Sequence, residues 1–308
     1  MKIAFLNKYQ NSVNRGAETY VSELSKRLSK HHDVHIISDV NYFKILKNKY
    51  DLIIPTNGRL QVFITKIICI LSGAKMLVSG QSGIGLDDRL NLYAMPNLFV
   101  ALSTKALNWS KTVNPLVKSV YVPNGVDLKR FTPSSKLNGN GRKIILTVGA
   151  FTEQKRHDLV IKAVSKIADA YLIIAGGGGD RKEEIEKLCK KMLSGRYEII
   201  ETTNEKMPDI YKRANLFTLA SKPYESFGIV IVEAMASNVP VVVTDDPIRM
   251  EIVGDAGLFV DPTNLNKYVE TIEKALSTNW GDKPRKQAEK FSWDEVAKQY
   301  EDLFSEII

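Results

Sequence analysis

The sequence of 308 residues has little cysteine and no long apolar run. Its two cysteines, Cys69 and Cys189, stand in no metal or redox spacing, which argues against a disulfide framework and suits a reducing, cytoplasmic location. The longest apolar stretch, VFITKIICIL at 62–71, contains Lys66 and is half the ~20 residues that a membrane-spanning helix needs. The start, MKIAFLNKYQ, is too weakly apolar for a secretory signal. We therefore expect a chain that crosses no bilayer.

The sequence also contains no motif for a metal ion or for a nucleic acid. No Asp-X-Asp occurs, so no metal ion that bridges a diphosphate is expected. No aromatic RNA-binding motif and no zinc-finger spacing occurs either, so no nucleic-acid partner is expected.

Positive charge is concentrated in the first part of the chain. Residues 1–130 hold 18 Lys and Arg against 8 Asp and Glu, a net charge of +10, which leaves 25 against 27, or −2, for residues 131–308. Such asymmetry indicates that the N-terminal half faces an anion, such as a phosphorylated small molecule or an acidic membrane surface. The alternative is a solvated surface with surplus lysines.

The length and the pattern of the chain predict two α/β domains. A chain of 308 residues exceeds the ~250 to 300 residues at which one hydrophobic core usually divides. Short runs of Val, Ile and Leu alternate with stretches of helical periodicity, which is typical of parallel sheets covered by helices. The alternation stops at a linker-like stretch, SSKLNGNG, and then restarts. The expected strands are KIAFLN, DVHIIS, DLIIP, KMLVSG and LFVALS before the linker and KIILTVGA, AYLIIAGGGG, YEIIE, LFTLAS and VPVVVTD after it.

Four stretches of the sequence carry a resemblance to one enzyme family. They are RGAETYVSELSKRL, VPNGVDLKRFTP, VGAFTEQKRHDLVIKA and SKPYESFGIVIVEAMASNVPVV. In this order they resemble the retaining GT-B glycosyltransferases of the family 4 type, the glycosyl transferases group 1. The resemblance implies an α/β fold of two facing Rossmann-like domains with parallel sheets. The acceptor-side domain is expected at 1–125 and the nucleotide-sugar-binding domain at 126–290, with a last helix at 291–308 that packs back on the first domain.

The resemblance also implies a reaction. It is the transfer of a hexosyl or related group from a nucleotide-diphosphate sugar, with retention of configuration, to a glycan, lipid-linked or small-molecule acceptor. The leaving phosphate is thought to take the proton of the acceptor, so no positioned general base is required. A metal-independent enzyme without a cofactor, using only its nucleotide-sugar donor, is therefore expected.

The loop after KIILTVG holds the expected phosphate-binding groups. Lys155 and Arg156 lie where side chains reach ligands outside the carboxyl end of a parallel sheet. A cation there offsets the charge that grows on a departing phosphate. The resemblance implies that Lys155 is catalytic in this way and that Arg156 and Gly149 help to bind the donor. The alternative for Lys155 is a solvent-exposed lysine in a turn.

Two glutamates bracket the apolar run in YESFGIVIVE, where an ionised carboxylate is costly unless it is paired. A helix is expected to begin at Phe227, so that the free amides near Phe227, Gly228 and Ile229 bind phosphate. The resemblance implies that Glu225, in the preceding loop, faces the donor sugar and acts in catalysis. Glu233, inside the helix, is expected to hold both ribose hydroxyls. The alternatives are a charge favoured by the helix dipole for Glu225 and a buried salt bridge for Glu233.

Two glycine-containing loops complete the expected donor site. Arg15 and Gly16 follow the first strand, and in the resembling enzymes this loop lies over the diphosphate and the acceptor site. The alternative for Gly16 is a plain turn glycine. The run Gly176 to Gly179 lacks the third glycine of a dinucleotide fingerprint, because position 181 is Arg181, which argues against a nicotinamide oxidoreductase. We interpret the run as a flexible loop near the nucleotide and place Tyr211 beside the base.

Three positions depart from the pattern of the resembling enzymes. Ala150 stands where a second phosphate-binding arginine is usual, and Gln81 and Ser82 stand where the N-terminal domain commonly offers a histidine. Asn238 replaces a glycine after the helix, at a place where Asn also tolerates left-handed backbone. We interpret His157, the histidine in the loop after KIILTVG, as structural.

The acceptor side is indicated only by charge and apolar character. NYFKILKNKYD at 41–51 interleaves lysines with apolar residues, and RLQVFITKIICIL follows at 59–71. Such interleaving suits an interfacial helix that reaches an anionic lipid surface, and an ordinary amphipathic helix packed on the sheet is the alternative. A cytoplasmic protein, peripheral at the inner face of the membrane, is the corresponding hypothesis.

Two other functions are compatible with parts of this pattern, and a third is not. A non-catalytic nucleotide-sugar-binding protein fits Ala150 and the missing histidine as signs of a decayed site. A sugar-nucleotide epimerase fits the same fold. A glycan phosphorylase would need a lysine that binds pyridoxal phosphate, and the sequence offers no candidate for it.

Overall fold

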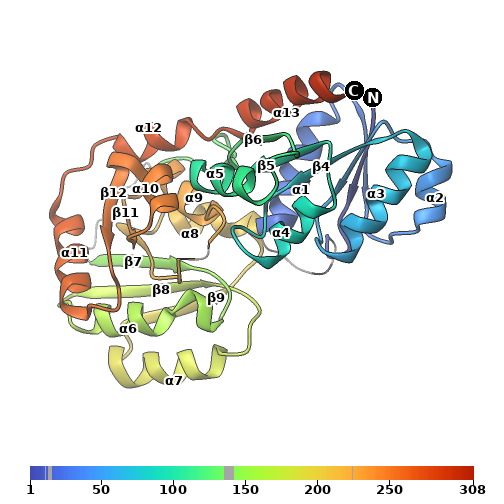
Figure 1. The fold of residues 1–308 in the computed structure, drawn as a ribbon. Coiled ribbons are helices and arrows are strands. Elements are labelled where there is room, and N and C mark those ends of the chain that lie inside the picture. Colours follow the sequence, from blue (N-terminus) through green and yellow to red (C-terminus); the bar gives the residue numbers. More distant parts are fainter. Residues whose placement is uncertain (11, 13–15, 135–141, 224) are drawn as a thin grey trace. The chain divides into compact units, whose positions relative to one another are not determined.

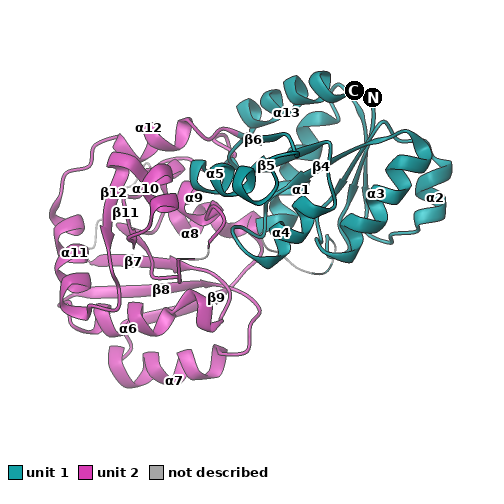
Figure 2. Cartoon of the chain, viewed as in Figure 1, with its two compact units in different colours: residues 1–125, 293–308 teal, residues 126–292 magenta. Residues whose placement is uncertain are grey.

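The protein folds into two compact units, each built around one parallel sheet (Figure 1). The structure is a computed structural model and describes residues 1–10, 12, 16–134, 142–223 and 225–308. The first unit comprises Met1–Gly125 and Trp293–Ile308, and the second comprises Val126–Ser292 (Figure 2). The predicted α/β class with two parallel sheets is confirmed. Most of the predicted linker, residues 135–141, lies outside the described residues.

In the described part of the first unit, six strands follow the order β2-β1-β3-β4-β5-β6. Its elements are β1 (Lys2–Leu6), α1 (Gly16–Leu28), β2 (Asp33–Ile37), α2 (Tyr42–Lys47), β3 (Leu52–Pro55), α3 (Leu60–Ser72), β4 (Lys75–Ser79), α4 (Leu86–Tyr93), β5 (Leu98–Ala101), α5 (Thr104–Val113), β6 (Ser119–Tyr121) and α13 (Trp293–Ile307).

Different helices cover the two faces of this sheet. Because side chains alternate along a strand, Ile3 and Phe5 of β1 point to one face and Ala4 and Leu6 to the other. The first pair packs with α1 and α13, and the second packs with α2, α3, α4 and α5. The C-terminal helix thus contributes to the core of the first unit through Trp293, Val296, Tyr300 and Phe304.

The second unit also has six strands among its described residues, in the order β12-β11-β10-β7-β8-β9. Its strands are β7 (Lys143–Val148), β8 (Ala170–Gly176), β9 (Tyr197–Glu201), β10 (Leu216–Leu219), β11 (Val241–Thr244) and β12 (Gly257–Val260). Its α-helices are α6 (His157–Ser165), α7 (Lys182–Leu193), α8 (Met207–Tyr211), α9 (Ile229–Ala236), α10 (Pro247–Val253), α11 (Leu265–Ser277) and α12 (Lys283–Glu289), and its short 3-10 turns are η1 (Glu153–Lys155), η2 (Asn204–Lys206) and η3 (Gly254–Ala256).

The strand order of the second sheet changes direction at β7. From β7 the chain adds β8 and β9 on one side and β10, β11 and β12 on the other. In parallel sheets of this kind, ligands bind outside the carboxyl ends of the strands at the point where the order changes. The loops that follow β7 and β10 therefore occupy the place where a ligand is expected, and they contain Lys155 and Glu225.

No helix within the described ranges is long and apolar enough to cross a bilayer.

Candidate functional site

An ion pair joins the two loops at the place where the strand order changes. Lys155 ends η1 after β7, and Glu225 lies between β10 and α9. The Lys155 ammonium donates a hydrogen bond to Oε1 of Glu225, and these side chains are only 21% and 15% exposed. Charges that are partly withdrawn from water attract each other more strongly than at an open surface. Two side chains 70 positions apart, both predicted as catalytic, are thus brought into contact.

Gly149 gives the Lys155 side chain the space to reach this pair. A Cβ atom built on Gly149 would lie 3.1 Å from both Cγ and Cδ of Lys155. A larger residue at this position would therefore push on the stem of the lysine. The predicted contact of Gly149 with the donor stays a prediction.

Arg156 is engaged with the backbone of the loop that carries Glu225. Its Nε donates to the carbonyl oxygen of Ala220 at 2.6 Å, and one terminal nitrogen donates to that of Ser221 at 3.0 Å. Hydrogen bonds from a charged donor of this kind are among the stronger ones in proteins. The structure thus shows Arg156 supporting the loop after β10, while its predicted role in phosphate binding stays a prediction.

Arg249 supports the same loop and was not singled out in the sequence. Its side chain is completely buried, forms an ion pair with Asp246, and donates to Oγ of Ser221 at 2.6 Å and to the Lys222 carbonyl oxygen at 3.1 Å. Asp246 also caps α10, because its side chain accepts from the amides of Ile248 and Arg249. The Asp-Pro sequence before α10 indicates this cap, but nothing local indicates that the arginine turns inward to the Glu225 loop.

Tyr211 positions the carboxylate of Glu233. The Tyr211 side chain is fully buried, and its hydroxyl lies 2.8 Å from Oε2 of Glu233, which projects from α9. Burial, followed by the charge of Glu233, raises the pKa of the Tyr211 phenol well above its ordinary value, so the hydroxyl stays protonated and donates. The prediction that Tyr211 lies beside a base is therefore wrong, because its ring is enclosed by Phe131 and Phe217.

The helix after Glu225 begins at Ile229, two residues later than predicted. Gly228 has φ 90°, a left-handed conformation that cannot belong to a right-handed helix and that glycine adopts readily. The side chain of Phe227 is buried against Phe291, with ring centroids 5.7 Å apart. The first amides of α9 are those of Ile229 and Val230, and these have no partner inside the helix. The predicted binding of phosphate by Phe227, Gly228 and Ile229 stays a prediction.

The end of the same helix agrees with the sequence. Asn238 has φ 58°, so the left-handed backbone predicted for this position is confirmed. Its side-chain amide donates a hydrogen bond to the carbonyl oxygen of Gly281 and accepts one from the backbone amide of Arg285. These bonds tie the end of α9 to the start of α12.

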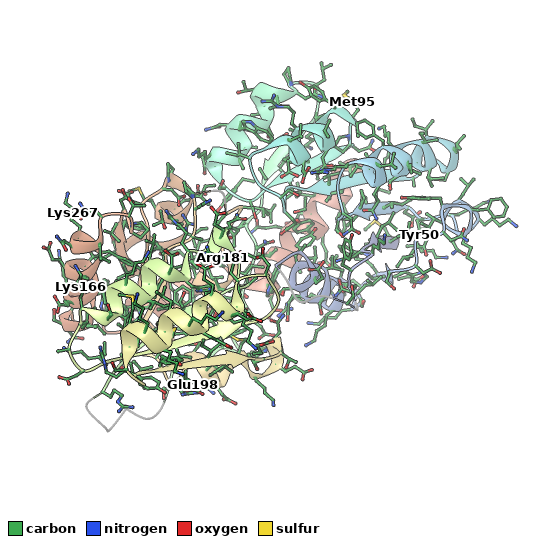
Figure 3. The ribbon with its side chains drawn as sticks, turned by 90° about the horizontal axis from the view of Figure 1, so that it is seen from below. Tyr50, Met95, Lys166, Arg181, Glu198 and Lys267 are labelled. Atoms are coloured by element: carbon green, nitrogen blue, oxygen red, sulfur yellow. The ribbon has the colours of Figure 1, made fainter. Side chains whose placement is uncertain are left out.

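The glycine run after β8 is a hydrogen-bonded part of the site. The carbonyl oxygen of Gly178 accepts from the amide of Phe151 at 2.9 Å, and Arg181, labelled in Figure 3, donates its amide to the Phe151 carbonyl at 3.0 Å. A Cβ atom on Gly179 would lie 2.3 Å from that same carbonyl oxygen. Gly178 and Gly179 are therefore packed against the loop that leads to Lys155, while the prediction of a flexible loop near the nucleotide stays a prediction.

His157 lies beneath this loop as a neutral residue. Its ring is buried, and its Nε2 lies 3.2 Å from the carbonyl oxygen of Ala150. Burial lowers the pKa of His157 to about 4, so the imidazole carries no charge near neutral pH. The structural interpretation of His157 is thus confirmed, and the ring adds no second cation at the place where Ala150 replaces arginine.

The predicted residues of the first unit are only partly described. Gly16 is the exposed first residue of α1, and Arg15 lies outside the described residues. Gln81, which stands where a histidine is usual, exchanges two hydrogen bonds with the buried Asn124, at 2.9 and 3.0 Å. Gln81 also donates to Ser79 at 2.9 Å. This side chain is therefore held in a polar network at the end of β4.

The buried carboxyl group of Asp88 makes the stability of the first unit depend on pH. Burial raises the pKa of Asp88 to about 7, against the opposing effect of hydrogen bonds from Asn91 and the Gly83 backbone. The unfolded chain releases this proton at about pH 4. The folded state therefore binds the proton more tightly, and its stability falls as the pH rises from about 4 to 7.

We expect Asp88→Asn to remove this dependence. The free energy of unfolding of the variant, minus that of the wild type, should be larger at pH 8 than at pH 5 by on the order of a few kcal/mol. Urea unfolding at both pH values measures this difference. Asp87→Asn is the matched control, because Asp87 pairs with Arg59 at the surface. Parallel curves for Asp88→Asn and the wild type across this range would contradict the prediction.

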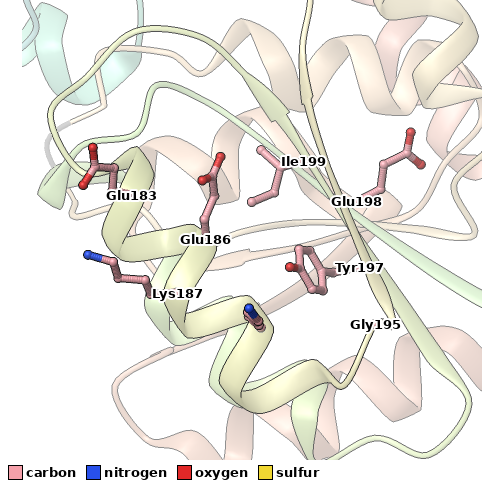
Figure 4. A pocket seen from close by; sticks show the side chains of 8 residues that line it. Glu183, Glu186, Lys187, Gly195, Tyr197, Glu198 and Ile199 are labelled. Atoms are coloured by element: carbon pink, nitrogen blue, oxygen red, sulfur yellow. The ribbon is translucent and has the colours of Figure 1, made fainter.

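A pocket of about 720 Å³ lies away from these loops, between α7 and β9 (Figure 4). Its lining includes Lys187 and Glu186 from α7 and Tyr197 from the first half of β9. Because ligands of such sheets bind at the carboxyl ends of the strands, this pocket does not share the location of the Lys155 and Glu225 pair. Among the described residues, no group of three or more His, Cys, Asp or Glu side chains is arranged to hold a metal ion.

Comparison with protein families identifies the second unit. The model of the family described as glycosyl transferases group 1 matches residues 129–292, just over half of the chain. The chain belongs to this family. The matched region of this group 1 member contains the whole arrangement around Lys155, Glu225 and Glu233.

Individual relatives extend over more of the chain. An uncharacterized glycosyltransferase of Methanocaldococcus jannaschii is 31% identical over an alignment of 252 residues, which covers 70% of this chain and 64% of the relative. The mannosylfructose-phosphate synthase of Agrobacterium fabrum is 31% identical over an alignment of 208 residues, which covers 58% of this chain and 45% of the relative. The chain thus spans between about half and two thirds of the length of these curated relatives.

The fold of the group 1 member has close counterparts among solved structures. Anabaena HepE in complex with UDP and glucose aligns with a TM-score of 0.85 at 16% sequence identity, over 99% of this chain and all of the other. This likeness confirms the predicted GT-B fold.

Proposed function

We propose that this chain transfers a sugar from a nucleotide-diphosphate sugar to an acceptor hydroxyl, with retention of configuration and without a metal ion or other cofactor. The observation that carries the proposal is the contact between Lys155 and Glu225 at the point where the second sheet changes strand order. It lies inside the region that matches a glycosyltransferase family. The structurally similar HepE is described in complex with UDP and glucose and with UDP-glucose, which supports such a donor.

The chemistry follows from the charges of these side chains. As the bond between the sugar and the diphosphate breaks, negative charge grows on the leaving phosphate, and the Lys155 ammonium stabilises it. The acceptor oxygen bonds to the same carbon, and its proton passes to the leaving phosphate. Glu225 keeps Lys155 in place and accepts hydrogen bonds from the sugar. These steps need a positive group and amide donors at the phosphates, which Lys155 and the start of α9 offer.

The ribose is assigned to Glu233. Its carboxylate is held by Tyr211 at one oxygen, which fixes its orientation before the donor arrives. We propose that this carboxylate accepts hydrogen bonds from the ribose hydroxyls. The residues proposed to bind the diphosphate are Gly149, Arg156, Phe227, Gly228 and Ile229. Arg15 and Gly16 are also proposed as donor-binding residues.

The acceptor is proposed to be a glycan or a lipid-linked or small hydroxyl compound that binds to the first unit. The positive charge of residues 1–130 favours an acceptor that carries phosphate or lies at an anionic membrane surface. We also propose a cytoplasmic location, consistent with two free, buried cysteines.

A donor screen followed by product analysis tests the proposal. Melting temperatures are recorded with UDP-, GDP- and ADP-sugars, and the stabilising donor is then incubated with candidate acceptors. We expect one nucleotide to stabilise the protein, transfer to continue in EDTA, and NMR of the product to show the anomeric configuration of the donor. No stabilisation by any donor would remove the donor-site assignment, and binding without transfer to any acceptor would favour a non-catalytic binding protein.

Tyr211→Phe should weaken nucleotide binding by roughly tenfold, because the loss of a hydrogen bond to a charged group costs about 1.5 kcal/mol or more. Calorimetric titration with the stabilising nucleotide measures this change. Repeating the titration with the 2′,3′-dideoxy nucleotide distinguishes positioning from simple destabilisation. If Tyr211 acts through Glu233 on the ribose, the difference between variant and wild type should shrink for the dideoxy form.

Tyr268→Phe is the matched control for this variant. Tyr268 is also buried in the second unit, and its hydroxyl lies 2.6 Å from Oγ1 of Thr218. It should lower the melting temperature without changing the affinity for the nucleotide. Equal losses of affinity in the two variants would contradict the positioning role of Tyr211.

A further inference from the structure

Helix α3 of the first unit is apolar on two opposite faces. Its inner face packs on the sheet through Val62, Thr65, Ile68 and Cys69, which are buried. Its outer face, named the α3 stripe below, consists of five exposed apolar side chains: Leu60, Phe63, Ile67, Ile70 and Leu71. They recur every three or four residues, apart from the adjacent last pair, and so lie on one side of the helix. An ordinary amphipathic helix packed on a sheet has a polar outer face, so packing explains only the inner face.

The α3 stripe belongs to a surface that differs from the rest of the molecule. Fifteen large apolar side chains are exposed among the described residues, and ten of them lie between Phe43 and Leu116, in the layer that contains α2 to α5. Only Met250 comes from the second unit. Five neighbouring apolar side chains on one helix form the kind of exposed patch that marks an interaction site.

Cations flank the α3 stripe. Residues 41–75 contain six Lys and Arg and a single acid, Asp51, and one of these cations, Arg59, is paired with Asp87 of α4. Lys66 is the only charged residue within α3. Helix α2, which lies beside α3 (Figure 1), exposes Lys44 and Lys47, and the Lys47 ammonium lies 4.5 Å from the centre of the exposed Phe43 ring. Apolar side chains with cations beside them match a surface that offers both acyl chains and negative charge.

We propose that the α3 stripe, with Phe43, Lys44, Lys47 and Lys66 beside it, is a docking surface for an anionic lipid bilayer. Helix α3 lies in the interface, with its outer apolar side chains among the acyl chains and the lysines at the phosphate groups. The backbone polar groups inside a helix are already bonded to each other, so such a face needs no directional partner, which suits lipid. The proposal concerns the first unit and does not depend on the donor chemistry of the second.

The positive charge of this surface favours an anionic bilayer over a second copy of the chain as its partner. Two copies that met stripe to stripe would bring Lys44, Lys47 and Lys66 of each toward those of the other, and like charges across an interface oppose association. A bilayer with anionic headgroups supplies the opposite charge instead. Since α3 begins five residues after β3 ends, docking would also bring the carboxyl edge of this sheet close to the bilayer.

Vesicle flotation of the full chain tests the proposal. The protein is mixed with phosphatidylcholine vesicles, or with vesicles that also contain phosphatidylglycerol, and is floated in a density gradient. We expect flotation only with the anionic vesicles and a decrease at high salt, because screening weakens attraction between exposed charges. Protein that stays at the bottom with anionic vesicles at low salt would overturn the proposal.

Two double variants separate the apolar from the electrostatic contribution to vesicle binding. The double variant Ile67→Glu, Ile70→Glu changes side chains that are 57% and 70% exposed, and should reduce partitioning at least tenfold while the protein stays folded. The double variant Lys44→Ala, Lys47→Ala keeps the apolar stripe, and should reduce partitioning about fivefold for each lysine and lower the salt dependence.

The matched control is Ile36→Glu. Ile36 is an exposed isoleucine on the edge strand β2, outside the layer of α2 to α5. This control should float like the wild type, and an equal loss of vesicle binding there would overturn the assignment to α3.

Light scattering without lipid tests whether a second copy of the chain occupies the surface instead. A dimer that Ile67→Glu, Ile70→Glu dissociates, without vesicle binding by the wild type, would show that a second copy occupies the surface.

Discussion

Lys155→Ala should lower the rate of sugar transfer by roughly 10² to 10³-fold, the effect that follows when one preorganised stabilising group is removed from a transition state. The ammonium is the group that meets the leaving phosphate in the proposed reaction; Gly149 leaves space for its side chain, and Glu225 holds it in place. Steady-state kinetics at saturating donor measures the change. Glu225→Gln should also lose transfer while it still binds the free nucleotide, since the glutamate faces the sugar.

The combination of these variants tests whether the two side chains act together. Because Lys155 and Glu225 are in contact, the losses of the single variants should not add in the double variant. Lys222→Ala is the matched control, since its side chain forms a more exposed ion pair with Glu153 between the same two loops. It should change transfer little. Full activity of Lys155→Ala, or equal losses in Lys222→Ala, would exclude the proposed role.

Gly176→Ala should destabilise the second unit by about 3 kcal/mol or more and lower its melting temperature by roughly 6 to 12 °C. A Cβ atom at Gly176 would lie 2.1 Å from the carbonyl oxygen of Gly149 and 2.8 Å from its carbonyl carbon. Both are backbone atoms at the end of β7, so neither can move aside as a side chain would. Any relief of the clash displaces the loop that carries Lys155, and transfer should fall with stability. Thermal unfolding and kinetics measure the two effects.

Gly177→Ala is the control for this prediction. A Cβ atom on Gly177 would meet no atom within 4 Å. This variant should melt within about 2 °C of the wild type, because surface substitutions of this kind usually change stability by less than 0.5 kcal/mol. Similar melting of Gly176→Ala and the wild type would show that the two loops approach each other less closely than described.

Local sequence patterns predict much of the fold, but they are weakest at the sheet edges. The interior strands are continuous apolar runs because both of their faces are buried. Strands β6 and β12, the last strand of each sheet, are absent from the predicted set. Strand β6 is only the three half-buried residues Ser119–Tyr121, which leave little apolar signal. The helix predicted from Phe227 starts later, because the left-handed backbone of Gly228 is not visible in hydrophobic periodicity.

The candidate site shows a similar division. Lys155, Glu225 and Glu233 are recognisable from short motifs, since each motif lies within one loop or helix turn. Tyr211 and Arg249 act on those motifs from other elements, so their inward-facing positions depend on packing that no local spacing encodes. The glycines at the end of β8 and after it are visible in the sequence, but the reason for a glycine at 176 is the backbone of Gly149 after β7.

The sequence by itself determines the two parallel sheets, the family and the carboxylates and lysine of the proposed donor site, because these depend on residue type and periodicity over short distances. Only the tertiary structure decides that β7 and β10 are neighbours, so that Lys155 meets Glu225. It also decides which apolar face of α3 packs on the sheet and which stays exposed. Both outcomes depend on contacts between segments far apart in the chain, which are fixed only when the sheets assemble.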